Sequence, residues 1–267
     1  MDFQYLYIPI GVPTFHLESA QAEFDASVSL LKSLDDAVVA PSEMLLSLDK
    51  LLAFLEGKHP DLLIVQNVTF ANGAYIAEVL RRLDAPVLLW TLKEPVVDGG
   101  RLRLNSLTGA YSAANVLHAF DRPFEYVYGS PKEADAQRAI AATIRAARLR
   151  KALRGLNVLQ VGHTPQGFGF GRALDMEMMT TFGANLLSIE ARELIDMAKS
   201  YKADEVAPFL EDARSRLVGL DALPARNVED FGRLYKAYSD YVKAHHIGAL
   251  SSRCWPDFFT AFGTPVC

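Results

Sequence analysis

Four polar side chains gather in the stretch "GVPTFHLESAQ" (11–21), directly after a short apolar run: Thr14, His16, Glu18 and Gln21. Each supplies a hydrogen-bond donor or acceptor, and such a group of side chains can hold the hydroxyl groups of a sugar. The alternative is ordinary helix capping, in which Glu18 or Ser19 satisfies free backbone amides at a helix start. His16 and Glu18 are therefore candidate substrate-binding residues.

Two further polar clusters follow the next two apolar runs of the N-terminal half. The stretch "QNVTFANG" (66–73) contributes Gln66, Asn67, Thr69 and Asn72, and "WTLKEP" (90–95) contributes Trp90 and Glu94. The carboxyl ends of parallel strands lie along one edge of a sheet, and open α/β sheets bind ligands there. Three polar clusters on one edge favour a binding surface.

A glycine-rich stretch, "GHTPQGFGFGR" (162–172), lies between an expected strand and an expected helix. The context suits a phosphate-binding loop, but the G-x-G-x-G spacing differs from the dinucleotide pattern, and two phenylalanines would crowd a pyrophosphate. The glycines also suit a loop that needs unusual backbone angles. If the loop lines a cleft, His163 and Gln166 are its candidate contacts.

The segment "SSRCWPDFF" (251–259) brings Arg253, Cys254, Trp255 and Asp257 together just after an apolar run. The group looks like the rim of a site. Cys254 beside an arginine could form a thiolate, but no base is placed to activate it. The histidines and cysteines show no zinc-binding spacing, so no metal ligand is assigned, and the catalytic residues stay unknown.

The order of apolar runs and helical patterns sets the fold class. Strands are expected at 5–11, 61–67, 85–95 and 124–129, and helices at 20–34, 43–58, 73–83, 109–120 and 130–153 with Ser130 as N-cap. The pattern restarts with strands at 157–162, 185–191 and 247–252 and helices at 171–182, 191–200, 203–217 and 228–246. This alternation predicts an α/β protein with two tandem Rossmann-like three-layer domains and mainly parallel sheets. The domains are 1–153 and 154–267, and the second is expected to be incomplete because it has about three strands.

Composition and charge limit the kinds of partner that this chain can be expected to bind. The 267 residues carry a formal net charge of −5, and half of them are hydrophobic. No stretch is basic enough to indicate a nucleic-acid partner. No apolar run approaches the length needed to span a membrane. The two cysteines and the lack of a signal peptide suit a reducing cytoplasm.

The whole chain resembles the N-terminal and middle portions of the L-fucose isomerase and L-arabinose isomerase superfamily, particularly its shorter, fucose-isomerase-like members. Four stretches carry the resemblance: "GVPTFHLESAQ" (11–21), "NSLTGAYSAANVLHAFDRPFEYVYG" (105–129), "LNVLQVGHTPQGFGFGRALDMEMMTTFGANLLSIEARELID" (156–196) and "ALSSRCWPDFFTAFGTPVC" (249–267). Their order and spacing are more specific than any one of them.

The resemblance implies aldose–ketose isomerisation of a small-molecule sugar. In the family a divalent metal, usually Mn²⁺, polarises the carbonyl, and carboxylates move a proton through an enediol. It also implies a homo-oligomer with shared sites, in which His16 faces the sugar and Arg253 and Trp255 are candidate substrate-binding residues that support the pocket. The alternative is that Arg253 and Trp255 belong to a structural element that braces the sheet of the second domain. The family's metal-binding carboxylates and histidine follow the Cys-Trp-Pro element. This chain is therefore expected to be an N-terminal part, inactive alone, with no metal of its own; Asp257 is not the metal ligand.

The alternative is a non-catalytic cytoplasmic sugar-binding or regulatory module, in which two α/β domains enclose a cleft. Saturable, metal-independent binding of an aldose by calorimetry would favour that module.

Overall fold

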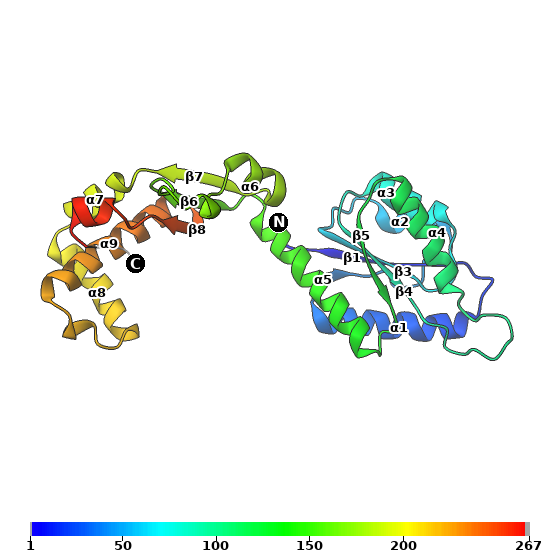
Figure 1. The fold of residues 1–267 in the computed structure, drawn as a ribbon. Coiled ribbons are helices and arrows are strands. Elements are labelled where there is room, and N and C mark those ends of the chain that lie inside the picture. Colours follow the sequence, from blue (N-terminus) through cyan, green and yellow to red (C-terminus); the bar gives the residue numbers. More distant parts are fainter. Residues whose placement is uncertain (1, 265–267) are drawn as a thin grey trace. The chain divides into compact units, whose positions relative to one another are not determined.

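A computed structural model describes residues 2–264 and divides the chain into two compact units (Figure 1). Unit 1 extends to Lys151 and unit 2 begins at Ala152. The sequence places the boundary at 153, the last residue of the helix within which the two units divide. Each unit is an α/β structure built on a parallel sheet.

Unit 1 contains a five-stranded parallel sheet in the order β2-β1-β3-β4-β5. Its strands are β1 (Tyr5–Ile10), β2 (Val38–Val39), β3 (Leu62–Asn67), β4 (Val87–Thr91) and β5 (Phe124–Tyr128). The central strands β1, β3 and β4 are buried along their whole length, as expected for strands covered on both faces. This sheet confirms the predicted α/β class with mainly parallel strands.

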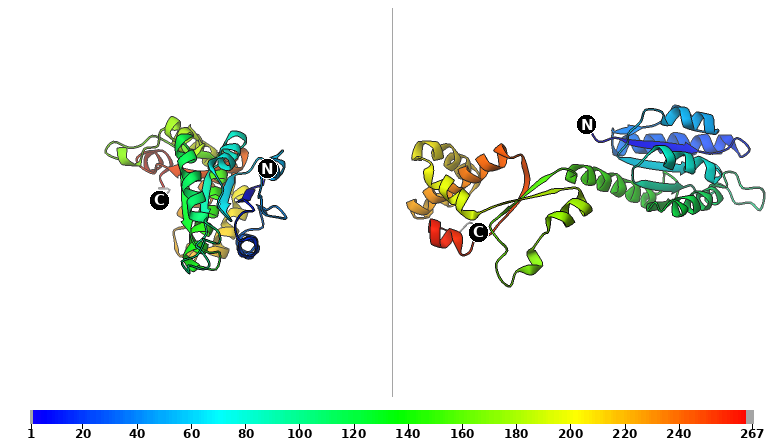
Figure 2. Two further views of the ribbon diagram at one scale, coloured as in Figure 1. Left: turned by 90° about the vertical axis from the view of Figure 1, so that its right-hand side faces the viewer. Right: turned by 90° about the horizontal axis from the view of Figure 1, so that it is seen from above.

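Helices cover both faces of this sheet (Figures 1 and 2). One core joins Leu6, Ile8 and Ile10 to helices α2 (Leu48–Leu55), α3 (Gly73–Arg82) and α4 (Ser106–Ala119). The other core joins Tyr5 and Tyr7 to helices α1 (Leu17–Leu34) and α5 (Ala134–Leu153). Alternate side chains of β1 therefore pack into two separate apolar layers, one on each face of the sheet.

Unit 2 has a three-stranded parallel sheet in the order β7-β6-β8 within residues 152–264. Its strands are β6 (Asn157–Val161), β7 (Asn185–Ile189) and β8 (Ile247–Ser252), and its helices are α6 (Asp175–Phe182), α7 (Ala191–Ser200), α8 (Ala203–Arg216) and α9 (Ala225–Ala244). Leu159 and Val161 pack with the buried faces of α7 and α9. Helix α6 lies beside β7, apart from the group formed by α7, α8 and α9 (Figure 2).

Several helix starts differ from the predictions by three to five residues, and two of them have a clear local cause. The helix expected over 43–58 spans only Leu48–Leu55, because Leu45 forms a parallel bridge with Ile10 and Ser47 caps the helix by accepting from the Lys50 amide. The helix expected over 130–153 begins at Ala134. Ser130 lies four residues before this start and caps the preceding turn instead: its hydroxyl accepts from the Lys132 amide at 3.4 Å, and its own amide donates to the Glu133 carboxylate at 2.9 Å.

Short segments account for the rest of the described chain. The two-residue strand β2 was not predicted, because it is too brief to show a pattern. Across residues 2–264, none of the helices combines the length and apolar character that crossing a membrane would need. Cys267, which entered the compartment argument, lies outside the described residues.

Candidate functional sites at the carboxyl edges of the two sheets

The loop after β1 is held in place by the loop after β3. The Thr69 hydroxyl accepts from the Val12 amide at 2.8 Å and donates to the Val12 carbonyl at 3.1 Å. Gly11 is required there, because a Cβ atom at that position would lie 2.4 Å from Thr69 Oγ1. The close approach of these two loops fixes the start of the candidate segment 11–21.

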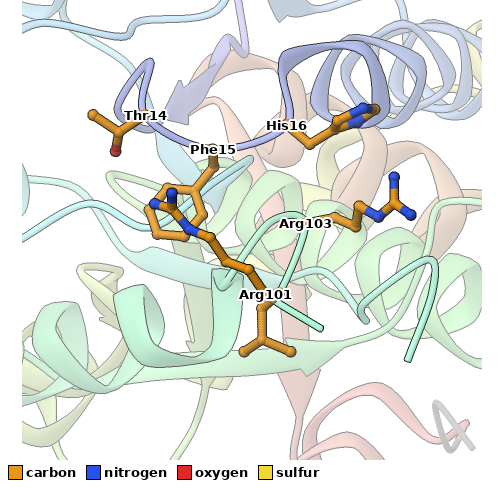
Figure 3. A pocket seen from close by; sticks show the side chains of 6 residues that line it. Thr14, Phe15, His16, Arg101 and Arg103 are labelled. Atoms are coloured by element: carbon orange, nitrogen blue, oxygen red, sulfur yellow. The ribbon is translucent and has the colours of Figure 1, made fainter. Parts of the chain in front are cut away.

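A pocket of about 340 Å³ opens beside this segment (Figure 3). It is lined by Thr14, Phe15, His16, Arg101, Leu102 and Arg103. The backbone joins its two walls, since the His16 amide donates to the Arg103 carbonyl at 2.9 Å. The pocket thus combines the loop after β1 with the loop after β4, at the edge where ligands of open α/β sheets bind.

Glu94 organises the second wall of the pocket. Its Oε2 accepts from the amides of Arg103 at 2.9 Å and Leu104 at 3.1 Å, and its Oε1 accepts from the Asn105 amide at 2.5 Å. The carboxylate is therefore committed to the backbone. Glu94 therefore positions the loop. The sequence had suggested that Glu94 contributes to a binding surface, and this expectation is wrong because both carboxylate oxygens are engaged by the backbone.

His16 is the N-cap of α1. Its Nδ1 accepts from the Ser19 amide at 3.2 Å, so a neutral His16 carries its proton on Nε2. The alternative that Glu18 or Ser19 caps this helix is wrong, because the imidazole does so. Glu18 is exposed in the first turn of α1 and is not among the residues that line the pocket.

Most of the other predicted contacts of unit 1 are buried. Gln66, Thr69 and Trp90 are fully buried, and each has a partner inside the protein. Gln66 donates to the Ser27 hydroxyl at 2.9 Å, and the Trp90 indole donates to the Gly129 carbonyl at 2.9 Å. The expectation that these side chains form a binding surface is wrong, since a ligand at the surface cannot reach them.

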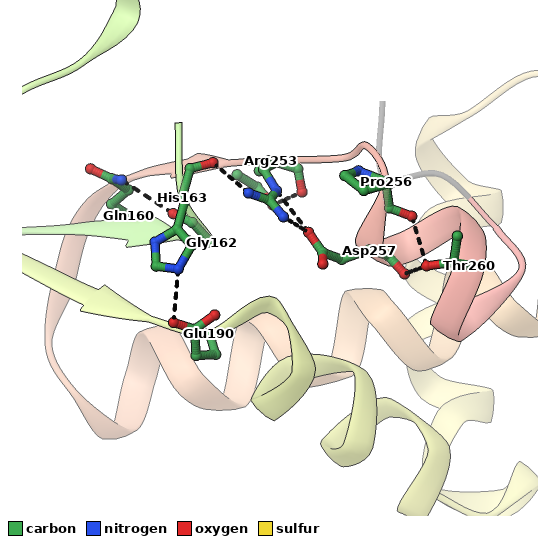
Figure 4. Close-up of polar contacts among 9 residues, drawn as sticks. Gln160, Gly162, His163, Glu190, Arg253, Pro256, Asp257 and Thr260 are labelled. Carbon is green, nitrogen blue, oxygen red and sulfur yellow. Dashed lines mark hydrogen bonds and ion pairs between the residues drawn. The ribbon is translucent and has the colours of Figure 1, made fainter. Parts of the chain in front are cut away.

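The second candidate site lies at the carboxyl edge of the unit 2 sheet (Figure 4). His163 follows β6 and Glu190 follows β7, and His163 Nε2 lies 3.3 Å from Glu190 Oε1. Both side chains are exposed, so they are available to a ligand. An imidazole and a carboxylate at this separation can bind hydroxyl groups and pass a proton between them.

Arg253 connects the strands at this edge. Its backbone amide donates to the Val161 carbonyl at 3.0 Å, and its guanidinium donates to the His163 carbonyl at 3.1 Å and, through Nε, to Asp257 Oδ2 at 2.7 Å. Arg253 therefore braces the loop that carries His163 against the segment after β8. This is the bracing role that the sequence left open for it.

Glycine is needed at the start of the His163 loop. Gly162 has a φ of +76°, in the left-handed region that other residues rarely adopt, and Arg253 packs against it. The other predicted residues of this edge are not brought into the cluster. Gln166 is exposed in the loop, and the Trp255 side chain is 62% exposed.

The metal implied by the family resemblance can be tested against the donor groups. Within residues 2–264, no group of three or more His, Cys, Asp and Glu side chains could hold a metal ion. The described residues do not fit the Mn²⁺ site of the resemblance, and no reaction step through a metal follows from them.

Arg101 and Arg103 were missed from the sequence, although both lie in the pocket with His16. The signal was the alternation in "GRLRLN" (100–105), in a loop that follows an apolar strand on the same predicted edge. Site residues predicted in the two halves occupy different units: His16 and Glu18 in unit 1, and Arg253 and Trp255 in unit 2.

Three curated relatives that the chain matches are all sulfoquinovose isomerases. The chain is 58% identical over 267 residues to a sulfoquinovose isomerase of Clostridium sp. (strain MSTE9), covering 100% of this chain and 60% of that protein. It is 36% identical over 269 residues to a sulfoquinovose isomerase of Priestia megaterium, and 33% identical over 264 residues to one of Alkalicoccus urumqiensis. Each of these two matches covers 98% of this chain and 59% of the relative.

The chain thus spans about three fifths of the length of the curated relatives that it matches. No family model matches it.

Proposed function

We propose that this chain forms part of an aldose–ketose isomerase that acts on sulfoquinovose. The observation that carries the proposal is the 58% identity to the Clostridium sulfoquinovose isomerase over the whole of this chain. The parallel α/β units and the exposed polar groups at their carboxyl edges are consistent with a sugar enzyme.

Isomerisation of an aldose requires a proton to leave C2 and to return at C1. At the same time the hydroxyl on C2 loses its proton and the carbonyl oxygen on C1 gains one. His163 and Glu190 offer an imidazole and a carboxylate 3.3 Å apart at an exposed edge. We assign to them hydrogen bonding to sugar hydroxyls and the transfer of a hydroxyl proton. Arg253 positions His163 by holding the carbonyl of that residue.

The finer part of the proposal concerns the metal. The family resemblance implies Mn²⁺ as the group that polarises the sugar carbonyl. We propose that its ligands belong to the portion of the complete enzyme that corresponds to the unmatched two fifths of the relatives. This chain alone would then bind substrate groups without completing the isomerisation.

A chimera tests the activity. Residues 1–267 would replace the matching part of the Clostridium relative, and conversion of sulfoquinovose to its ketose would be followed by NMR in the presence of Mn²⁺. The chimera is expected to isomerise sulfoquinovose at a rate within about tenfold of the parent, because the replaced part is 58% identical. A chimera that folds and assembles like the parent but leaves sulfoquinovose unchanged refutes the proposed function.

The chain on its own tests the finer part. Purified 1–267 with Mn²⁺ is expected to form no ketose from sulfoquinovose, L-fucose or L-arabinose. Turnover by 1–267 alone would show that the catalytic groups lie within this chain, and would refute the assignment of the metal ligands to another portion.

A further inference from the structure

We propose that the pocket of His16, Arg101 and Arg103 binds the anionic substituent of the sugar, a sulfonate. The inference rests on the proposed function, because sulfoquinovose is an aldose whose C6 carries a sulfonate group. It assigns substrate specificity to unit 1, and to Arg101 and Arg103, which the sequence did not single out.

Arg101 presents a guanidinium without a competing acid. It stacks over the Phe15 ring, with 4.9 Å between the guanidinium carbon and the ring centroid. Among residues 2–264, no hydrogen bond or ion pair engages that guanidinium. Most arginines of unit 1 are different: Arg122 and Arg148, for example, each pair with an aspartate. The stacking holds Arg101 in place while its N–H groups stay available.

Arg103 lies on the other side of the pocket, near His16 (Figure 3). The nearest carboxylate oxygen belongs to Asp98, 3.8 Å from the guanidinium nitrogen, which is too long for a hydrogen bond. The Arg103 side chain is about one third exposed and Asp98 is more exposed still, so their attraction is weak. An anion in the pocket would displace Asp98 at little cost.

The backbone adds to the positive potential. The pocket includes the N-cap of α1, a helix of 18 residues whose N-terminus carries a partial positive charge. The other carboxylate nearby, Glu94, has both oxygens engaged by backbone amides and does not neutralise the arginines through hydrogen bonds to them. The residues that line the pocket thus include two guanidinium groups and the N-cap of a helix and no carboxylate, whereas Asp98, Glu94 and Glu18 lie outside the lining.

The chemistry of a sulfonate matches this arrangement. It keeps its single negative charge throughout the physiological pH range and has three acceptor oxygens, which suits the paired N–H donors of arginine. At about 340 Å³ the pocket is at the small end of ligand sites, so it suits the sulfonate and the adjacent carbon better than a whole disaccharide. Glucose, with a neutral hydroxyl at C6, would gain nothing from the arginines.

The direct test uses methanesulfonate, the smallest alkyl sulfonate, with ¹⁵N-labelled chain. The Nε–Hε signals of Arg101 and Arg103 are expected to shift saturably, against sodium chloride at equal ionic strength. Arg101→Leu and Arg103→Leu should each weaken binding at least about tenfold, since each removes hydrogen bonds to a charged group. Arg145→Leu is the matched control: this exposed arginine of α5 has the same charge but lies outside the pocket, and its loss should change binding less than about twofold.

Two results would overturn the inference: no saturable shift of the arginine signals, or equal weakening by all three substitutions, which would indicate attraction to net charge alone. Spectra of the variants show whether the fold is kept. Arg103→Lys keeps the charge without the paired donors, and it should bind methanesulfonate more weakly than the wild type.

The chimera separates this inference from the proposed function. If the inference holds, Arg101→Leu and Arg103→Leu raise KM for sulfoquinovose at least about tenfold. An active chimera whose KM is unchanged by both substitutions overturns the sulfonate site and leaves the function standing. Binding of methanesulfonate by the arginines in a folded but inactive chimera refutes the function and leaves an anion site.

Discussion

Replacing Glu94 with glutamine should loosen the loop that carries both pocket arginines. The carboxylate accepts three backbone N–H groups, with Oε2 serving Arg103 and Leu104 and Oε1 serving Asn105. Glutamine has one acceptor oxygen, and its NH₂ group would face an amide N–H. If the glutamine oxygen accepts from the Arg103 and Leu104 amides, the hydrogen bond from the Asn105 amide is lost. The two remaining hydrogen bonds then have a neutral acceptor in place of a charged one. A hydrogen bond to a charged group contributes about 1.5–3 kcal/mol, so the cost is about 2–4 kcal/mol.

Amide hydrogen exchange measures this effect locally. A cost of about 2–4 kcal/mol to the closed loop corresponds to exchange roughly 30- to 700-fold faster at Arg103, Leu104 and Asn105, since each 1.4 kcal/mol is a factor of ten. Methanesulfonate binding should weaken in the same variant, because the arginines lose their fixed positions.

Glu43→Gln is the matched control for Glu94→Gln. It removes an exposed ion pair with Lys50, which should change stability by less than about 1 kcal/mol and leave exchange in the 101–105 loop unaltered. If Glu94→Gln exchanges at these three amides like the wild type, the carboxylate does not hold the loop and the reasoning is refuted.

Three further changes test the packing and electrostatics of the two units. Gly232→Ala should destabilise unit 2 by about 1 kcal/mol in urea unfolding, because the new Cβ would lie 2.6 Å from Val206 Cγ1 and overpacking outweighs the gain in helix propensity. Leu159→Ala removes a fully buried side chain beneath α7 and α9 and should lower the free energy of unfolding of unit 2 by about 2–5 kcal/mol. Burial alone would raise the pKa of Asp35, but hydrogen bonds from Arg148 and the Ala37 amide outweigh it and lower that pKa. Arg148→Leu should therefore raise the pKa of Asp35, as measured by NMR titration, and lower stability by about 1 kcal/mol at pH 7.

The pH dependence of the last variant has a definite sign. The folded-state pKa of Asp35 is depressed, so its contribution to stability is present above the unfolded-state pKa and is lost as pH falls through the folded-state pKa. Arg148→Leu should thus destabilise unit 1 at neutral pH and converge with the wild type in acid. Arg145→Leu on the same helix is the control, and an equal effect of both substitutions would contradict the pairing with Asp35. For Gly232→Ala, an unchanged free energy of unfolding in urea would show that the Val206 side chain moves aside without loss of stability, and would contradict that prediction.

The arrangement of helices and strands follows closely from local pattern. Apolar runs such as 61–67 and 157–162 had to be buried strands, since they are short, bounded by breakers and separated by amphipathic helices, and that alternation requires parallel pairing. Where local signals competed, the prediction erred. The helical pattern over 43–58 continued through Leu45, but the bridge of that residue to Ile10 decided its conformation.

The candidate sites divide in the same way. The sequence alone determined that polar residues follow the strands and that His16, His163 and Arg253 stand in the loops at the carboxyl edges. Only the tertiary structure decided which of the polar groups reach a ligand. Gln66 faces inward because Ser27, distant in the chain, meets it in the core, whereas Arg101 and Arg103 reach the pocket because Glu94 folds their loop against His16. Burial and hydrogen bonding depend on neighbours far along the chain, and the local sequence pattern does not identify those neighbours.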